Sequence, residues 1–138
     1  MKYLKSITSI VFFLILGYAF TAFVPQDQKK GKPWNIPEKY VKMENPYRGD
    51  ASLLKIGRLL YSKHCKSCHG SKGKGDGSKA PQLETFPGDF TSAAFKKYSD
   101  GTLYYMTYVG RDEMKAFDKK IRDEEDRWAV IMYLKTFK

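Results

Sequence analysis

The sequence of 138 residues is poor in cysteine and histidine, with only two of each. A zinc ribbon needs a second pair of ligands elsewhere in the chain, yet all four of these residues fall within residues 64–69. Four ligands so close together are poorly placed to form a tetrahedron. Two cysteines at this spacing are also no disulfide framework of the kind found in small secreted domains. The scarcity of both residue types therefore argues against a structural zinc site and against a disulfide-held fold.

The cysteines and one histidine form a single motif, Cys65-Lys66-Ser67-Cys68-His69. The pattern C-x-x-C-H is the attachment signature of a c-type haem: the two thiols add to the vinyl groups and the histidine binds the iron. The two intervening residues let both sulfurs reach one edge of the macrocycle, while the backbone places the imidazole under the iron. We predict one covalently attached haem c, with His69 as its proximal iron ligand. A thioredoxin-like redox pair and half of a metal site are the alternatives.

Charged residues are absent from residues 7–24, an apolar run of 18 residues that follows Lys2 and Lys5. A basic start before an apolar stretch is typical of an export signal, and its positive end stays in the cytoplasm. A helix of this length would span about 27 Å, close to the hydrocarbon thickness of a bilayer. We expect residues 1–24 to be a signal peptide or an uncleaved membrane anchor. The remaining chain would then lie on the periplasmic side of the cytoplasmic membrane.

Prolines divide the rest of the chain, because four of them fall within residues 25–49. Such a segment disfavours regular structure and is stiff, so we predict a Pro/Lys-rich linker over residues 25–49 and a mono-haem domain over residues 50–138. Large apolar side chains are unusual in a pure linker, and we expect them to lie along the domain surface or to contact a partner subunit. They are Trp34, Ile36, Tyr40 and Tyr47.

The predicted domain reads as a series of helices, without a strand hairpin or a repeat. We expect one helix from near Asp50 up to the haem motif, a second over residues 100–110, and a last one that Asp123 caps. A polar loop with Met114 lies between the last two. The expected fold is all-α, with about three to five helices around one haem.

A glycine-rich stretch, residues 72–78, follows the haem motif. It lacks the residue order of a phosphate-binding loop, and no strand precedes it. We therefore expect a tight turn beside the haem edge, where glycines supply positive φ angles. The next element contains Pro81, whose carbonyl is a candidate acceptor for the imidazole N–H of His69; such a bond fixes the orientation of the ring.

The formal net charge of +10 is concentrated in the half of the chain that contains the haem motif. Thirteen Lys or Arg residues face four acids between residues 29 and 79, whereas eight face seven from residue 111 onward. A positive field of this kind steers an acidic partner and raises its on-rate. A solvated lysine surface that attracts anionic lipid is the alternative. Nucleic acid is not an expected partner, because the chain has no nucleic-acid-binding motif.

Taken together, these pieces resemble class I c-type cytochromes, in particular the small bacterial mono-haem ones, over about residues 50–137. The resemblance implies a few helices around one haem, with the first and last helices crossing, and a loop methionine as the distal iron ligand. It assigns that role to Met114, although Lys115 stands where the family usually has proline. Met106, or an open or water-bound sixth position, is the alternative. The matching residues outside the haem motif are Gly57, Leu60, Tyr61, Gly70, Gly73, Gly75, Asp76, Gly77, Gly101, Leu103, Tyr104, Phe117, Arg127, Trp128 and Tyr133.

The function that this resemblance implies is electron transfer rather than catalysis. We expect a periplasmic carrier of single electrons between respiratory redox partners, either diffusing or as a membrane-tethered subunit of a larger oxidoreductase. Its partner would be an acidic redox protein or a membrane respiratory complex, oriented by lysines near the haem motif. A haem c enzyme or gas sensor with an open sixth position is the main alternative. A basic structural module with an incidental motif is a third.

Overall fold

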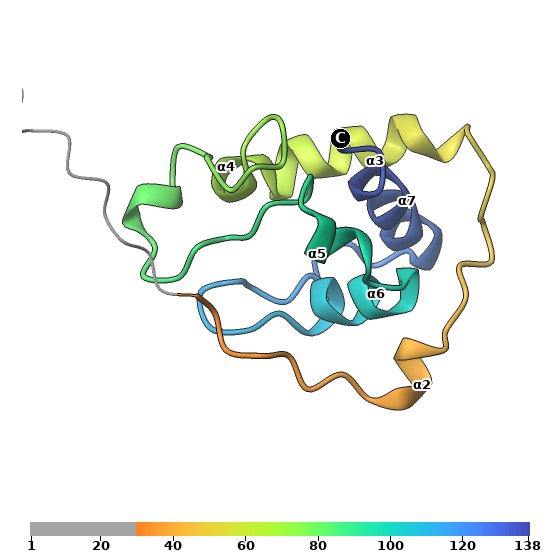
Figure 1. The fold of residues 1–138 in the computed structure, drawn as a ribbon. Helices are drawn as coiled ribbons and strands as arrows, with labels where there is room; N and C mark the ends of the chain where they lie inside the picture. Colours follow the sequence, from red (N-terminus) through yellow and green to blue (C-terminus); the bar gives the residue numbers. More distant parts are fainter. Residues whose placement is uncertain (1–29) are drawn as a thin grey trace, which may run out of the picture.

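The structure, a computed structural model, describes residues 30–138, so the predicted signal peptide or anchor over residues 1–24 lies outside it. The described part contains helices and no strand, which confirms the all-α prediction. None of its helices combines the length and the apolar character needed to cross a membrane. The elements in chain order (Figure 1) are α2 (Glu38–Val41), α3 (Leu53–His64), α4 (Lys66–His69), the 3₁₀ helix η1 (Ala80–Gln82), α5 (Ala93–Lys96), α6 (Asp100–Val109) and α7 (Glu124–Leu134).

Three long helices form the frame of the domain. The helices α3, α6 and α7 have 12, 10 and 11 residues. The other three helices, α2, α4 and α5, have four residues each. Residues 30–138 thus contain six α-helices rather than the three to five expected, because single-turn helices add to the three long ones.

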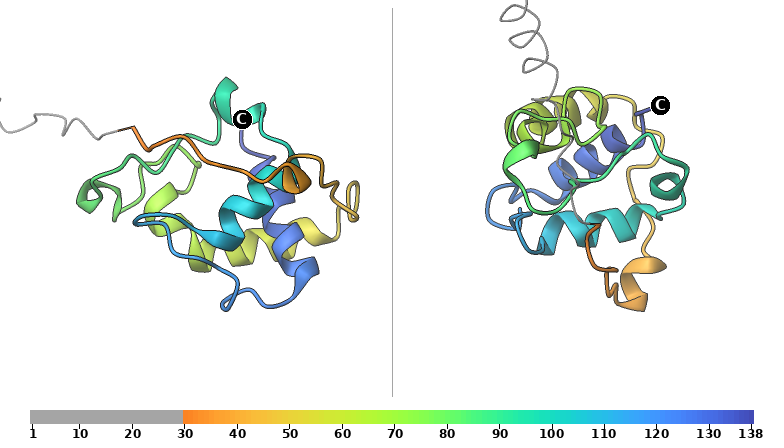
Figure 2. Two further views of the ribbon diagram at one scale, coloured as in Figure 1. Left: turned by 90° about the horizontal axis from the view of Figure 1, so that it is seen from below. Right: turned by 60° about the vertical axis from the view of Figure 1, so that its left-hand side comes forward.

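The long helices α3 and α7 pack across each other at Gly57, as both views in Figure 2 show. A Cβ atom at this position would collide with the backbone carbonyl of Ala129 and would lie 2.9 Å from Cβ of Tyr133. Next to the contact, the rings of Tyr61 and Tyr133 lie 5.4 Å apart. The absence of a side chain at Gly57 therefore sets how closely the two helices approach.

Side chains cap the starts of α5, α6 and α7, whereas α3 departs from the prediction. The carboxylate of Asp123 accepts a hydrogen bond from the amide of Glu125 (2.9 Å) and caps α7 as expected. In contrast, α3 begins at Leu53, three residues later than Asp50. The Asp50 carboxylate instead accepts from the amide of Ser52 (2.9 Å) in a turn before the helix. The Asp50 carboxylate therefore stabilises this local turn and does not cap the first turn of α3.

The core lies between α6 and α7, where Trp128, Val130 and Ile131 are fully buried. Arg127 connects this core to the end of the polar loop. Its guanidinium donates to the backbone carbonyls of Ile121 and Arg122, both at 2.7 Å. A third bond runs to the Tyr104 hydroxyl, at 2.8 Å. The return of the loop into α7 is therefore fixed by side-chain bonds.

Residues 30–49, which we call the N-terminal strap, lie along the domain from the polar loop to α6 (Figure 1). The four large side chains that were unusual for a linker, Trp34, Ile36, Tyr40 and Tyr47, pack against the core. The rings of Tyr40 and Tyr105 lie 4.7 Å apart, and the Ser99 hydroxyl donates to the carbonyl of Val41 (2.9 Å). The predicted linker region thus makes specific contacts with the helices that follow it.

Candidate functional site

The two cysteines lie one helical turn apart at the junction of α3 and α4. The amides of Cys68 and His69 both donate to the carbonyl of Cys65, at 3.1 and 2.9 Å. Both cysteines are free and partly exposed. Burial, with a smaller contribution from Cys68, raises the pKa of Cys65 to about 12. A redox-active pair needs a thiolate with a lowered pKa. The raised pKa of Cys65 therefore argues against the thioredoxin-like alternative.

His69 is half-buried at the end of α4. Its ring stacks on that of Phe90, with centroids 4.6 Å apart and planes at 25°. Burial lowers the pKa of His69 to about 4. Its Nδ1 atom is buried without a hydrogen-bond partner. A neutral imidazole is the form that binds iron, so the residues at this position fit a haem group.

A histidine that binds a metal usually donates a hydrogen bond from its other ring N–H. For His69, we predicted the carbonyl of Pro81 as the acceptor. Pro81 lies in η1, which is tied to α4 by a bond from the Lys79 amide to the Ser67 carbonyl (2.8 Å). The structure contains no hydrogen bond from His69 Nδ1 to Pro81. The bond to Pro81 therefore stays a prediction for the haem-bound protein.

The glycine-rich stretch after the motif forms a tight turn that closes α4. The amides of Gly75 and Gly77 donate to the carbonyls of His69 and Cys68, at 3.0 and 3.1 Å. Gly73 and Gly75 have φ angles of 69° and 74°, which other residues rarely adopt. Two amides of the turn thus bind the end of the attachment helix.

Tyr61 fixes the start of this turn from α3. Its hydroxyl donates to the carbonyl of Gly70 at 2.6 Å, and its ring is 2% exposed. Burial raises the pKa of Tyr61, so the hydroxyl remains a donor. Across the turn, the side chain of Asp76 occupies the space where a Cβ of Gly70 would lie. These contacts therefore fix the backbone conformation directly after His69.

Met114 lies in a tight turn within the polar loop. The backbone amide and carbonyl of Met114 bond to the carbonyl and amide of Arg111, at 2.8 and 2.7 Å. The carboxylate of Glu113 accepts from the amides of Glu84 (3.2 Å) and Thr85 (3.1 Å), which ties this turn to a distant loop. Met114 itself is half-buried against the core, and Lys115 is exposed. The turn therefore forms with lysine in the usual proline position.

The haem motif and the methionine loop lie close together. The rings of His64, which directly precedes Cys65, and Phe117, three residues after Met114, have centroids 5.9 Å apart. Figure 1 shows α4 and the loop of residues 111–122 at the same end of the domain. The alternative ligand Met106 is buried on α6 as part of the core. The fold thus brings the end of α3, next to the haem motif, against the loop that contains Met114.

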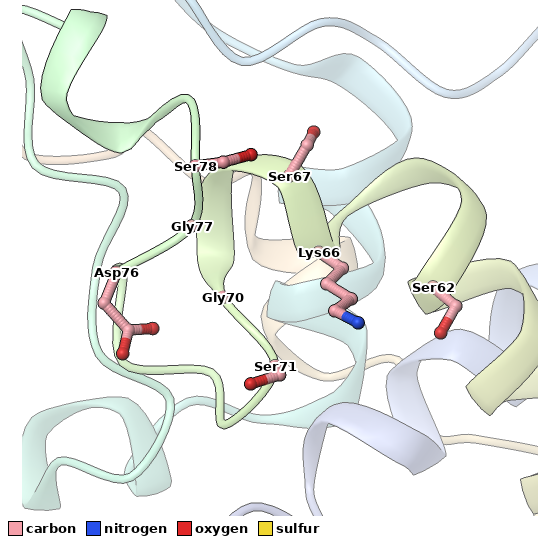
Figure 3. A pocket seen from close by; sticks show the side chains of 8 residues that line it. All are labelled: Ser62, Lys66, Ser67, Gly70, Ser71, Asp76, Gly77 and Ser78. Carbon is pink, nitrogen blue, oxygen red and sulfur yellow. The ribbon is translucent and has the colours of Figure 1, made fainter.

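A separate open hollow of about 400 Å³ lies on the outer side of α4 (Figure 3). Hydroxyl, lysine and carboxylate side chains line it, and none of its residues carries a large apolar side chain. Among residues 30–138, no three His, Cys, Asp or Glu side chains are grouped so as to hold a metal ion by themselves. The residues that line the hollow are Ser62, Lys66, Ser67, Gly70, Ser71, Asp76, Gly77 and Ser78.

A helical domain with two free cysteines one turn apart, a neutral histidine beside them and a nearby loop methionine defines a haem-binding protein. A sequence profile described as Cytochrome c matches residues 54–138, and the chain belongs to the cytochrome c family. No curated protein matches the chain. Membership in this family means that the chain binds haem c covalently, with its iron, and transfers electrons.

Two residues at the site, Glu113 and Arg111, were not singled out by the sequence. Glu113 and Arg111 are charged residues in a charged loop, and nothing local distinguishes them. Trp34 had a signal, since a tryptophan among prolines and lysines needs an apolar surface to cover. Its contact is with Arg111, whose guanidinium carbon lies 4.2 Å from the Trp34 ring centroid.

Proposed function

We propose that this cytochrome c is a class I, periplasmic carrier of single electrons between respiratory redox partners, with His69 and Met114 as axial ligands. The observation that carries the proposal is that the end of α3, next to the haem motif, and the loop with the half-buried Met114 meet at the rings of His64 and Phe117, whose centroids lie 5.9 Å apart. When bound, the haem supplies the change between Fe(III) and Fe(II). No substrate chemistry is assigned to the protein.

The two proposed ligands have different tasks. His69 holds the iron from the attachment helix, and its stacking on Phe90 fixes the plane of the ring. The Met114 thioether on the other side raises the reduction potential relative to a second histidine and blocks small ligands. Cys65 and Cys68 keep the haem attached in both oxidation states. Together these roles suit an electron carrier better than an enzyme or a gas sensor with an open iron.

The proposed partner surface is the positively charged region around α4 and the glycine-rich turn. Its four lysines are exposed, and none of them takes part in the ion pairs formed within residues 30–138. Exposed unpaired lysines attract an acidic redox protein or the acidic face of a membrane complex. We propose that residues 1–24 direct the chain to the periplasm and, if uncleaved, tether it to the membrane. The lysines are Lys66, Lys72, Lys74 and Lys79.

A potentiometric titration of the full chain matured with haem tests the proposal. We expect one reversible one-electron transition, and no binding of carbon monoxide to the reduced protein at concentrations that saturate five-coordinate haem. Ready carbon monoxide binding would contradict the carrier function and favour the enzyme or sensor. Electron transfer to an acidic redox protein should slow as the salt concentration rises, because the charges are exposed and screened. A rate independent of salt would contradict the lysine docking surface.

A further inference from the structure

The loop that contains Met114 has no helix or strand of its own, so its position depends on contacts with other segments. Arg111 makes several of these contacts. Its backbone forms both bonds of the Met114 turn, while its side chain extends away toward the N-terminal strap. Whatever holds the Arg111 side chain therefore also holds the turn that presents Met114.

The strap holds Arg111 in two ways. One guanidinium nitrogen, Nη1, donates to the carbonyl of Lys32. The guanidinium also lies over the Trp34 ring, with its carbon 4.2 Å from the ring centroid. Only 26% of the Arg111 side chain is exposed, and Trp34 is half-buried against the core. A cation–π contact that is partly removed from water is stronger than an exposed one.

The strap also approaches residues 84–85, the segment whose amides bond to Glu113. A Cβ atom on Gly31 would lie 2.9 Å from Arg111 Nη2 and 3.2 Å from Thr85 Cγ2. The amide of Thr85 donates to Glu113, next to Met114. Three segments distant in sequence, around residues 31–34, 84–85 and 111–114, therefore contact one another beside the proposed distal ligand.

We propose that Trp34 and Arg111 are positioning residues for the Met114 thioether, so that the N-terminal strap stabilises the methionine-bound state of the iron. The inference rests on the proposed ligation by Met114. Losing the contact between Trp34 and Arg111 would increase the fraction of molecules in which Met114 has left the iron. An added ligand would then bind more tightly, because its apparent affinity rises with the fraction of protein in which the sixth position is free.

The test is a titration of the ferric, haem-loaded full chain with imidazole, followed by the weak band near the red end of the spectrum that reports sulfur ligation. We expect Trp34→Ala to lower the apparent Kd for imidazole about tenfold, as the loss of a partly desolvated cation–π contact predicts. Trp34→Phe keeps an aromatic face for Arg111 and should restore most of the wild-type value. If Trp34→Ala fails to fold, Arg111→Gln tests the same contact and should act in the same direction.

Tyr40→Ala is the matched control, because Tyr40 anchors the same strap on α6, away from the methionine turn. Its apparent Kd for imidazole should stay within about twofold of wild type, even where the free energy of unfolding falls. An unchanged Kd in Trp34→Ala, or an equal change in both variants, would overturn the inference. The proposed function would then still stand if the sulfur band is present in wild type and lost in Met114→Leu. Absence of the band from the wild-type protein would overturn both.

Discussion

The proximal and distal sides of the haem site are held by different kinds of contact. On the proximal side, the hydrogen bonds that fix the Cys65–His69 turn lie within residues 61–79, and most of them are backbone bonds of a helix end; Phe90 adds a stacking contact with His69. On the distal side, Met114 lies in a loop whose contacts come from the N-terminal strap, from residues 84–85 and from α6. The proposed proximal ligand is therefore placed mainly by local hydrogen bonds, and the proposed distal ligand by the tertiary structure.

This difference matters for function, because the two sides control different properties. The proximal side attaches the haem and defines the histidine. Under the proposed ligation, the distal side would control the potential and the access of small ligands through the Met114 thioether. A loop held by side-chain contacts can be adjusted by single substitutions without loss of the cofactor. We expect substitutions on the two sides to separate attachment of the haem from access to its iron.

The largest expected effect separates the two sides directly. Cys68→Ala should abolish most of the covalent attachment, because one of the two thioether bonds cannot form. Met114→Leu should retain full attachment, since this side chain takes no part in it. Haem staining after denaturing electrophoresis measures both. Loss of covalent haem in Met114→Leu would show that the distal loop is needed for attachment and would break the distinction.

The second largest effect is expected at the contact between α3 and α7, where a substitution should lower the free energy of unfolding. Gly57→Val places side-chain atoms against the backbone of α7 and should lower the free energy of unfolding by about 3 kcal/mol. Guanidinium denaturation of the haem-loaded protein measures the loss. Ser62→Ala, on the exposed side of the same helix, should change the free energy of unfolding by less than about 0.5 kcal/mol. Equal stability of the two variants would contradict the close helix contact.

On the proximal side, Tyr61→Phe should have a smaller effect. It removes the donor to the buried Gly70 carbonyl and should lower the free energy of unfolding by about 1 kcal/mol. The imidazole affinity should not change, because that measurement reports the distal side. Tyr133→Phe, in the same aromatic cluster, is the control and should cost less. A marked rise in imidazole affinity in Tyr61→Phe would contradict the independence of the two sides.

The smallest effect is expected at Glu113. Glu113→Gln weakens two bonds to backbone amides near the surface and should raise the imidazole affinity by about two- to threefold. Asp118→Asn changes the same charge in the same loop and should leave the affinity unchanged. Titration of both ferric variants decides between them. If the two behave alike, net charge rather than the tie to residues 84–85 controls the distal loop.

The sequence was informative where structure is determined locally. The five-residue motif, the cap at Asp123 and the end of α6 at Gly110 could be predicted, because each depends on neighbouring residues. One local expectation was displaced: the first helix starts at Leu53 rather than near Asp50, because the Asp50 carboxylate stabilises a turn before the helix.

The distal side was only partly predictable, for a physical reason. Met114 was assigned through a family resemblance. The bonds that hold its loop are made by the neighbouring residues Glu113 and Arg111, and they join residues about 30 to 80 positions apart. Such pairs leave no periodic signal in the sequence. Trp34 was recognised as unusual in a linker, yet its partner Arg111 was not, because many charged side chains in the chain could have met it. Only the folded chain shows which one does.

The most direct test of the account is the optical spectrum of the ferric protein with Met114→Leu and Met106→Leu, two substitutions that nearly conserve volume. We predict that the sulfur band is present in the wild-type protein and in Met106→Leu, and that it disappears in Met114→Leu while the haem stays covalently attached. A band that persists in Met114→Leu, or one that disappears in Met106→Leu, would contradict the placement of Met114 at the iron.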